Sequence, residues 1–419
     1  MWFASTCVHG VPPRRRRVYH RTTLTAAATG APSTSDLAAL ERFRARFPIL
    51  GQRVYLNSCS QGALSLDVEE AVARFVESWR TYGSPWDRWV GEVERLRGVF
   101  ADAIGADADE VAVMPNASTA IAAIATALPF DADRRDVVLG EFEFPTMTHV
   151  WLAQQRRGAR IVRVRARGET LSVDRYAACI DERTLIVPAT HVCFRNGYRI
   201  DIPRLAALCR ERGAHFMLDD YQRTGTAPLD VHALGVDFMV TGALKYLLGS
   251  AGVAFLYVRR ELVERLEPLA TGWFGRIDPF AFHSDRLDWS PSARRFETGS
   301  PAVPNAYAAA AGIELLRTLG PTVIEGQIGR LVERFVSRAR GRGFDLATSD
   351  DPAERGSLAV VRSPDATTLV RRLEDRGIVA SARGTGIRVS FHAYNNEHDV
   401  DVMLEALDDE DALVCRRAG

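Results

Sequence analysis

The sequence is nearly devoid of lysine. Lysine and arginine together number 53 of the 419 residues, yet Lys245 is the only lysine, so arginine supplies every other basic side chain. Arginine keeps its proton in proteins, whereas the amine of lysine can lose it and attack a carbonyl group. We therefore expect amine chemistry at Lys245. A chance surface lysine would lie on a polar face, whereas Lys245 follows a strand-like run and precedes Tyr-Leu-Leu-Gly.

Other absences exclude whole classes of protein. No apolar run approaches the ~20 residues needed to span a bilayer, and the formal net charge of zero creates no overall field for nucleic acid or an anionic membrane. The six cysteines are dispersed without a Cys-x-x-Cys pair, which favours free thiols in a reducing compartment, and we expect a cytoplasmic protein. The nine histidines lack metal-binding spacings, so no metal site is expected.

Composition and pattern together predict three regions. Residues 1–35 contain no Asp or Glu, so we expect a disordered N-terminal tail, although acid-poor, arginine-rich composition also fits an organelle transit peptide. Residues 36–290 are expected to form a large α/β domain, with 36–53 packing against a smaller domain. Residues 291–419 are expected to form a linker helix and that smaller α+β C-terminal domain.

From residue 109 onward, short apolar strands alternate with amphipathic helices. This alternation predicts an α/β domain with a mostly parallel, seven-stranded sheet. Because sites in such sheets lie at the carboxyl ends of strands, the residues that follow each strand are the candidates for chemistry. The expected strands are Val111–Met114, Val137–Gly140, Arg160–Val164, Thr184–Ala189, His215–Leu218, Phe238–Thr241 and Val253–Val258.

Four kinds of side chain follow these strands. Ser118 and Thr119 open a helix after the first strand, where free N–H groups and the helix dipole suit a phosphate, although hydroxyls cap many helices. Phe144 follows the second strand, with core packing as its ordinary alternative. Asp219 follows the fifth strand, with turn capping as the alternative, and Lys245 follows the sixth. The combination matches what pyridoxal phosphate requires: an amine, an acid for the ring nitrogen, a phosphate cup and a stacking ring.

Several further motifs occur in a fixed order along the chain. They are Tyr55–Gly62, Asp219–Gln222 with Pro228–Val231, Lys245–Gly249 with Gly252–Val258, Phe296–Pro301, and Ile387–His392 with Tyr394-Asn395. In this order they resemble the class V aminotransferase family, a fold-type-I group of pyridoxal-phosphate enzymes that includes cysteine desulfurases, kynureninases and isopenicillin N epimerases. The resemblance covers nearly all of the folded chain and implies a smaller domain that closes over the substrate.

The resemblance also implies catalytic roles for individual residues. Lys245 would form an aldimine with pyridoxal phosphate and later shuttle protons. Asp219 would pair with the ring nitrogen, Gln222 would contact the ring oxygen and Phe144 would stack on the ring. Arg388 would bind the α-carboxylate of an amino-acid substrate, for which its two-pronged guanidinium is suited.

The family pattern further implies a homodimer with shared active sites. Ser118 and Thr119 would hold the phosphate within one subunit, and Ser300 would reach the phosphate of the neighbouring subunit. The segment Gly272–Gly275 would border the partner's site. Thr241 is a further candidate, because Gly242-Ala243-Leu244 stands where many relatives carry Ser-Gly-His, which removes a hydroxyl and an imidazole near the cofactor.

Two departures bear on the reaction. The segment Ser381–Ile387 holds no cysteine, which cysteine desulfurases need there to accept sulfur, so persulfide chemistry is not expected. Phe144 rather than histidine at the stacking position resembles the epimerase and lyase side of the family. The expected function is therefore an enzyme acting on the Cα or Cβ of an amino acid. Transamination, β-elimination and epimerisation stay open, and a non-catalytic cofactor-binding protein is the alternative from another class.

Overall fold

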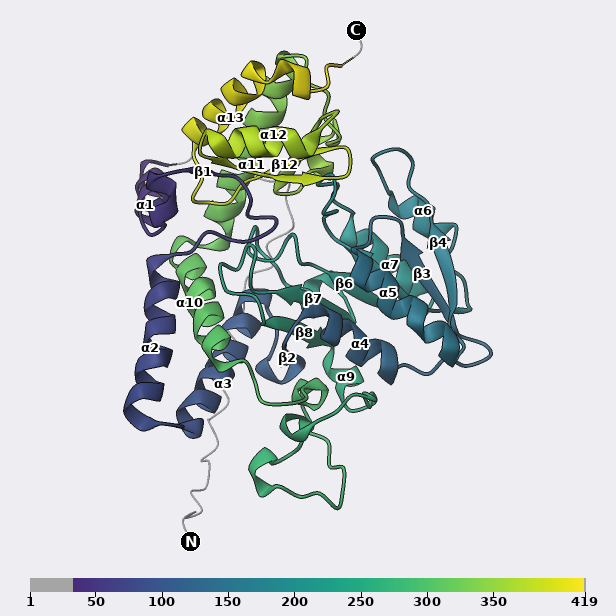
Figure 1. Cartoon of the computed structure of the whole chain (residues 1–419). Coiled ribbons are helices and arrows are strands. Elements are labelled where there is room, and N and C mark those ends of the chain that lie inside the picture. The colour runs from purple at the N-terminus through teal and green to yellow at the C-terminus, as the bar shows by residue number, and fades with distance from the viewer. Residues whose placement is uncertain (1–32, 418–419) are drawn as a thin grey trace.

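The fold centres on a seven-stranded sheet (Figure 1). A computed structural model describes residues 33–417 of the protein. The strand order is β2-β8-β7-β6-β5-β3-β4, in which β8 runs antiparallel to both neighbours and the other pairs are parallel. All seven predicted strands are present, and the α/β prediction is confirmed. Their bounds are β2 Val111–Met114, β3 Asp136–Gly140, β4 Arg160–Val164, β5 Thr184–Thr190, β6 His215–Asp219, β7 Phe238–Gly242 and β8 Ala254–Val258.

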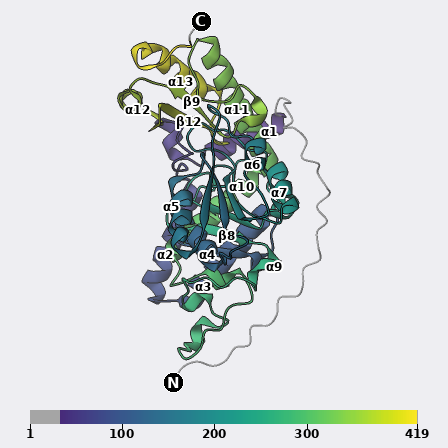
Figure 2. The ribbon, with the colours of Figure 1, turned by 90° about the vertical axis from the view of Figure 1, so that its right-hand side faces the viewer.

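Helices cover both faces of this sheet, so its central strands β5 and β7 are buried along their whole length. In Figure 2, α5 (Pro145–Ala153) lies on one side of the sheet and α7 (Ile202–Glu211) on the other. Along β7, Phe238 and Val240 belong to the core that includes α4 (Ala117–Ala127), whereas Met239 belongs to the core on the opposite face. Residues of one strand alternate between faces, so this division also fixes where the strand's later residues point.

Three long helices lie side by side at one edge of the sheet (Figure 1). They are α2 (Leu66–Tyr82), α3 (Trp86–Ile104) and α10 (Val303–Leu319), and α10 packs against the other two. The preceding helix, α1 (Thr34–Arg44), begins after Ser33, which caps it and accepts a hydrogen bond from the Asp36 N–H. The remainder of the predicted tail, residues 1–32, lies outside the described residues.

The C-terminal part forms a second, smaller layer above the sheet in Figure 1. Its antiparallel sheet has the order β11-β12-β9, and the strand β1 from the N-terminal region pairs in parallel with β10. Arg44 of α1 adds an ion pair of 2.8 Å to Asp399. The bounds are β1 Val54–Tyr55, α11 Pro321–Gly341, β9 Leu358–Arg362, α12 Ala366–Asp375, β10 Ile378–Val379, β11 Ser381–Arg383, β12 Gly386–Ser390 and α13 Glu397–Asp409.

The remaining helices are short: α6 Val173–Ala177, α8 Val231–Leu234 and α9 Arg260–Val263. Between α9 and α10 the chain forms a long segment with only 3-10 turns, which projects at the bottom of Figure 1. Within residues 33–417, no helix combines the length and the apolar content that a membrane crossing requires.

Candidate active site

Lys245 lies in a tight turn directly after β7. The Leu248 N–H donates to the Lys245 carbonyl (3.2 Å), and Leu248 adopts a left-handed backbone with φ 60°. Two glycines pack against this turn: a Cβ on Gly62 would lie 2.4 Å from the Lys245 oxygen, and one on Gly312 would lie 2.4 Å from the Leu247 oxygen. Because neither glycine can gain a side chain without displacing backbone, the turn that presents the amine is held rigidly.

Two aromatic rings flank the Lys245 amine. Its Nζ lies 4.4 Å from the ring centroid of Tyr221 and 6.0 Å from that of Phe144. Burial lowers the pKa of Lys245 to about 8; the negative charge of Asp219 opposes this shift, and the positive charge of Arg388 reinforces it. The amine is therefore much closer to its nucleophilic, unprotonated form at neutral pH than an exposed lysine would be.

Asp219 closes β6 at the same edge of the sheet. Its Oδ1 accepts a hydrogen bond from the Tyr221 N–H (3.1 Å), and its carbonyl accepts one from the His191 N–H (2.9 Å). Burial raises the pKa of Asp219 to about 6, and the Tyr221 N–H and the Lys245 charge limit the rise. The carboxylate is thus buried but mostly ionised at neutral pH, which suits a cationic partner.

A buried polar network supports Asp219 from behind. His191 Nδ1 lies 2.6 Å from Asp220 Oδ1, and the Thr224 hydroxyl donates to Asp220 Oδ2 (2.6 Å). Glu143 Oε1 accepts from the Thr190 N–H (3.0 Å), and burial raises the pKa of Glu143 well above its usual range, with the Asp219 charge adding to the rise. The sequence did not predict this network. The only signal for it in the sequence is that Glu143 and Asp220 are acidic residues next to apolar runs.

Gln222 faces the same region with one end of its amide unpaired. Its Nε2 donates to the Cys59 carbonyl (3.1 Å), while the buried Oε1 has no hydrogen-bond partner among the described residues. A buried polar atom without a partner costs free energy, so a bound polar group is the natural way to satisfy it. This observation fits a ligand with polar substituents beside Asp219 and Lys245.

Arg388, on β12, is the buried cation of the site. Its Nη1 donates to the Phe194 carbonyl (2.9 Å), and its Nη2 donates to Ser60 Oγ (2.7 Å) and Ser381 Oγ (3.0 Å). Phe194 also packs edge-to-face against Phe144 at 5.0 Å between centroids. Arg388 therefore connects the C-terminal part to the aromatic wall of the site, and the two serines orient its guanidinium.

The remaining predicted residues make no direct contact with the Lys245 amine among the interactions described above. Ser118 and Thr119 lie in the first turn of α4, where the Asn116 side chain accepts from the Thr119 N–H (2.9 Å) and Ser118 Oγ donates to Thr146 (3.2 Å). Thr241 is buried in β7, and its hydroxyl has no partner within the described part of the chain. Ser300 is exposed ahead of α10, in a segment anchored by the buried Glu297.

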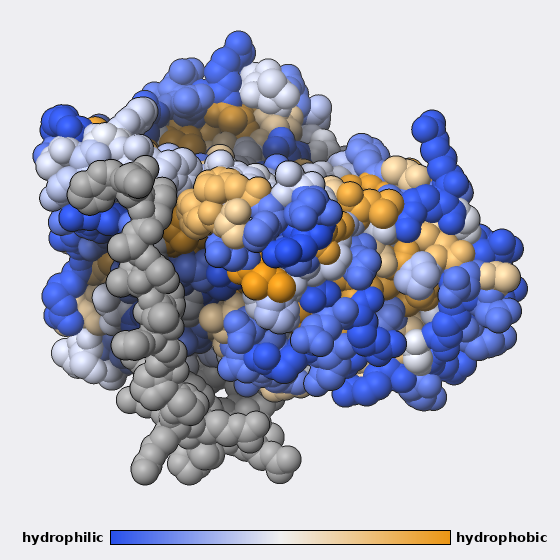
Figure 3. Space-filling view, turned by 90° about the horizontal axis from the view of Figure 1, so that it is seen from below, coloured by the Kyte–Doolittle hydropathy of each residue, from blue (hydrophilic) through white to orange (hydrophobic). Residues whose placement is uncertain are grey.

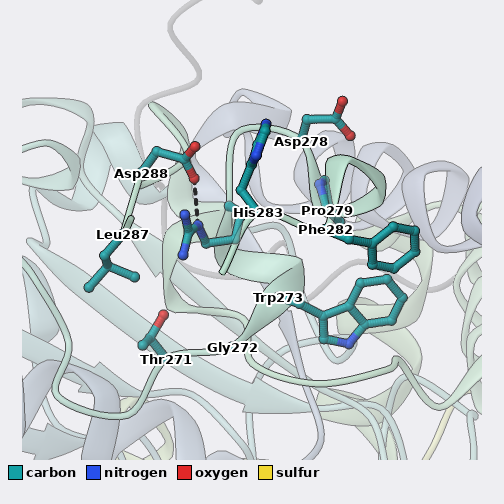
Figure 4. A pocket seen from close by; sticks show the side chains of 10 residues that line it. Thr271, Gly272, Trp273, Asp278, Pro279, Phe282, His283, Leu287 and Asp288 are labelled. Carbon is teal, nitrogen blue, oxygen red and sulfur yellow. Dashed lines mark hydrogen bonds and ion pairs between the residues drawn. The ribbon is translucent and has the colours of Figure 1, made fainter. Parts of the chain in front are cut away.

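A separate concavity lies in the segment between α9 and α10 (Figure 4). Trp273 and Phe282 stack there with centroids 5.9 Å apart, and Arg276 pairs with Asp288. None of the predicted site residues lines this concavity, although it contains part of the segment Gly272–Gly275 that was predicted to border a partner's site.

The family model for class V aminotransferases matches residues 80–403. The chain belongs to the class V aminotransferase family. Among relatives, the "Uncharacterized aminotransferase YcbU" of Bacillus subtilis (strain 168) is 34% identical over 88% of this chain and 96% of its own length. A kynureninase of Deinococcus radiodurans is 29% identical over 81% of this chain and 85% of its length.

Solved structures of two enzymes share the fold of this chain. The cysteine desulfurase from Thermococcus onnurineus NA1 superposes with a TM-score of 0.81 at 21% identity, covering 88% of this chain and 97% of that chain. The cystine C–S lyase C-DES gives 0.79 at 21% identity, covering 87% and 99%. The predicted family and fold are thus confirmed.

As a member of the class V aminotransferase family, the protein is an enzyme that depends on pyridoxal phosphate. The residues present fit that cofactor. Lys245 offers an amine with a lowered pKa, Asp219 a buried carboxylate and Gln222 an amide with an unpaired oxygen. Phe144, with 44% of its surface exposed, leaves a ring face free for stacking.

Proposed function

We propose that this class V enzyme breaks a bond at the Cα or Cβ of an amino acid. The observation that carries the proposal is that the Lys245 amine lies 4.4 Å from the ring of Tyr221, whose N–H donates to the buried Asp219. On its other side lies Phe144, which packs against Phe194, and the carbonyl of Phe194 accepts from the buried Arg388. Pyridoxal phosphate, when bound, supplies an electron sink for the bond that breaks. The chain's own residues then have to bind the substrate, orient it and move protons.

Three residues would carry those tasks. Arg388 would bind the α-carboxylate, because Ser60 and Ser381 already fix its guanidinium. Lys245 would hold the cofactor through Nζ and afterwards take the proton from Cα, for which a pKa of about 8 is suited. Asp219 would keep a negative charge beside the ring nitrogen.

Four further residues would make the cofactor's remaining contacts. Gln222 would contact the ring oxygen and Phe144 would stack on the ring. The phosphate would lie at the first turn of α4 with Ser118 and Thr119, because a helix N-terminus presents the positive end of the helix dipole to an anion.

Transaminases, lyases and epimerases of this kind differ in the step that follows removal of the Cα proton. Reprotonation at the cofactor would give transamination, loss of a Cβ substituent would give a lyase, and reprotonation on the opposite face would give an epimerase. Sulfur transfer to a protein thiol is disfavoured: residues 381–388 form a short hairpin without cysteine, and Cys193 is fully buried with a raised pKa caused by that burial.

We also propose a homodimer in which Ser300 enters the partner's site. Ser300 is exposed, and apolar side chains at the end of α2 and in the segment between α9 and α10 are exposed as well: Trp79, Tyr82, Leu269, Ile277, Phe280, Phe282 and Leu287. Figure 3 shows hydrophobic patches among hydrophilic residues on the face seen from below in the orientation of Figure 1. Light scattering should then give about twice the chain mass of 46.3 kDa. A monomer at working concentration would contradict the proposal.

Two broader proposals accompany it. Residues 291–419, together with 36–53, would act as a smaller domain that closes on the substrate and carries Arg388 with it. Structures with and without bound substrate in which Arg388 superposes unmoved would contradict closure.

A cytoplasmic location is proposed because the described cysteines, including Cys59 and Cys193, are free thiols.

The experiment is reconstitution followed by an amino-acid panel. The protein with pyridoxal phosphate should be yellow, and borohydride should attach the cofactor only to the peptide that contains Lys245. Lys245→Arg is the matched control, because it keeps the charge and loses the nucleophile. The panel then scores keto acid, released sulfide or thiol, and inverted stereochemistry. A colourless protein after cofactor addition would refute the proposal, and no turnover of any amino acid would leave only cofactor binding.

A further inference from the structure

Gly242 and Tyr221 occupy each other's space at the end of β7. A Cβ built on Gly242 would lie 1.9 Å from the Tyr221 hydroxyl oxygen and 2.2 Å from Cζ. No real side chain tolerates such distances, so the Tyr221 hydroxyl stands where a side chain of residue 242 would begin. Position 242 lacks the hydroxyl that many relatives carry there. The hydroxyl of Tyr221, which follows the neighbouring strand β6, occupies that space instead.

The face of the sheet decides what this hydroxyl can reach. Phe238 and Val240 point into the core that contains α4, and residue 242 follows them with the same two-residue period. Thr241 points to the opposite face, as Met239 and Ala243 do. Position 242, and with it the Tyr221 hydroxyl, consequently lies on the α4 side of β7, whereas the Thr241 hydroxyl does not.

Tyr221 is also suited to donate a hydrogen bond. Burial raises the pKa of Tyr221 to about 12, with the Asp219 charge adding to the rise, so the hydroxyl keeps its proton at any physiological pH. Its backbone N–H is fixed on Asp219 Oδ1 and its ring lies 4.4 Å from Lys245 Nζ. The side chain is only half-buried, so it is not sealed inside the core.

We propose that Tyr221 anchors the phosphate of the cofactor, with its hydroxyl replacing the side chain that Gly242 lacks. The inference rests on the proposed function, because it takes pyridoxal phosphate as the ligand and the first turn of α4 as the other part of the phosphate cup. It assigns to Tyr221 the compensating role for which Thr241 was the sequence candidate.

The test compares pyridoxal phosphate with pyridoxal, which lacks the phosphate. Tyr221→Phe keeps the ring and removes only the hydroxyl. It should weaken binding of pyridoxal phosphate by roughly tenfold or more, as expected for a hydrogen bond to a charged group. Its affinity for pyridoxal, followed by absorbance, should stay within about twofold of the parent protein. Tyr82→Phe, on the exposed end of α2, is the matched control and should change neither affinity.

A reciprocal exchange separates anchoring from structural support. Gly242→Ser alone should disturb the site, because its Cβ has no room beside Tyr221. In Tyr221→Ala/Gly242→Ser the space is free, and the new hydroxyl should recover most of the phosphate-dependent affinity that Tyr221→Ala loses. The unfolding temperature of each apoprotein shows whether the variant folds, and a variant that does not fold is replaced in the comparison by Tyr221→Phe.

Two results would overturn the inference. One is an unchanged affinity of Tyr221→Phe for pyridoxal phosphate. The other is an equal loss for pyridoxal phosphate and pyridoxal, which would mean that the hydroxyl supports the site without touching phosphate. A loss confined to pyridoxal phosphate in Thr241→Val, with none in Tyr221→Phe, would restore Thr241 as the anchor. Failure of the parent protein to bind pyridoxal phosphate at all would instead refute the proposed function.

Discussion

The guanidinium of Arg388 donates a hydrogen bond of 2.7 Å to the hydroxyl of Ser60, across 328 positions of the chain. Ser60 belongs to the turn that also packs Gly62 against the Lys245 backbone. One short segment therefore contacts both Lys245 and Arg388, the residue proposed to bind the carboxylate of the substrate. Ser60 thereby orients the Arg388 side chain without a substrate, which reduces the cost of ordering that side chain on binding.

We expect Ser60→Ala to weaken amino-acid binding by roughly three- to tenfold, the range for losing one hydrogen bond that orients a charged group. Turnover at saturating substrate should change much less, because the chemistry at Lys245 is untouched. The measurement is a spectral titration with an amino acid that the panel identifies. Ser84→Ala, in the link between α2 and α3, is the control. A loss of turnover without a loss of affinity would contradict this role.

The single lysine permits a direct titration of the site. Burial lowers the pKa of Lys245 to about 8 from the ordinary 10.5, so the amine is protonated and unreactive below pH 8 and becomes a nucleophile as the pH rises through that value. The rate of trinitrophenylation of the apoprotein should follow this curve. Lys245→Arg leaves only the chain's α-amine as a background to subtract. A midpoint near 10.5 would show that the amine is fully solvated.

Neighbouring carboxylates, Asp219 and Asp220, should respond differently to the same substitution. Asp219→Asn removes the charge proposed to face the ring nitrogen, so we expect turnover to fall by roughly 100-fold or more with little change in unfolding temperature. Asp220→Asn weakens the buried contacts to His191 and Thr224, so we expect a loss of stability of about 1–3 kcal/mol. Activity assays and thermal unfolding on both variants make the comparison, and interchanged results would refute these assignments.

The buried ion pair between Arg97 and Glu297 should be important for stability. Arg97 is 3% exposed and donates to Glu297, whose carboxylate also accepts from the Val113 N–H (2.8 Å). Glu297→Gln would remove one of the two carboxylates that pair with Arg97 and leave only Glu94 (3.0 Å), so we expect a loss of about 1.5–3 kcal/mol in the free energy of unfolding. Denaturant titration measures it, and the surface pair Arg80–Glu77 supplies the control, since Glu77→Gln should cost under about 1 kcal/mol.

Local patterns were sufficient to predict the sheet. Each strand is a short, mainly apolar run between turns, because β5, β7 and β8 are buried from end to end, so their ends could be located within two residues. The carboxyl ends of the parallel strands then placed Asp219 and Lys245 at one edge. The family motifs added Arg388, which local patterns alone would not have singled out.

Relations between distant segments could not be predicted. Ser60 and Ser381 show no local feature that associates them with Arg388, because the hydrogen bonds depend on how two parts of the fold meet. The role of Tyr221 depends on the separation of two strand ends, and a glycine in the sequence does not reveal which neighbour fills its space. Ser300, exposed in one chain, stays a prediction for the assembled protein.

The parallel pairing of Val54–Tyr55 with Ile378–Val379 has a consequence for biosynthesis. The ribosome releases the first strand long before its partner, so that strand must wait, unpaired, while the central sheet assembles. We expect the upper layer to be completed last, and its completion brings Ser60 to Arg388. The nascent chain should therefore acquire its cofactor-binding lysine turn before it acquires the ability to hold a substrate.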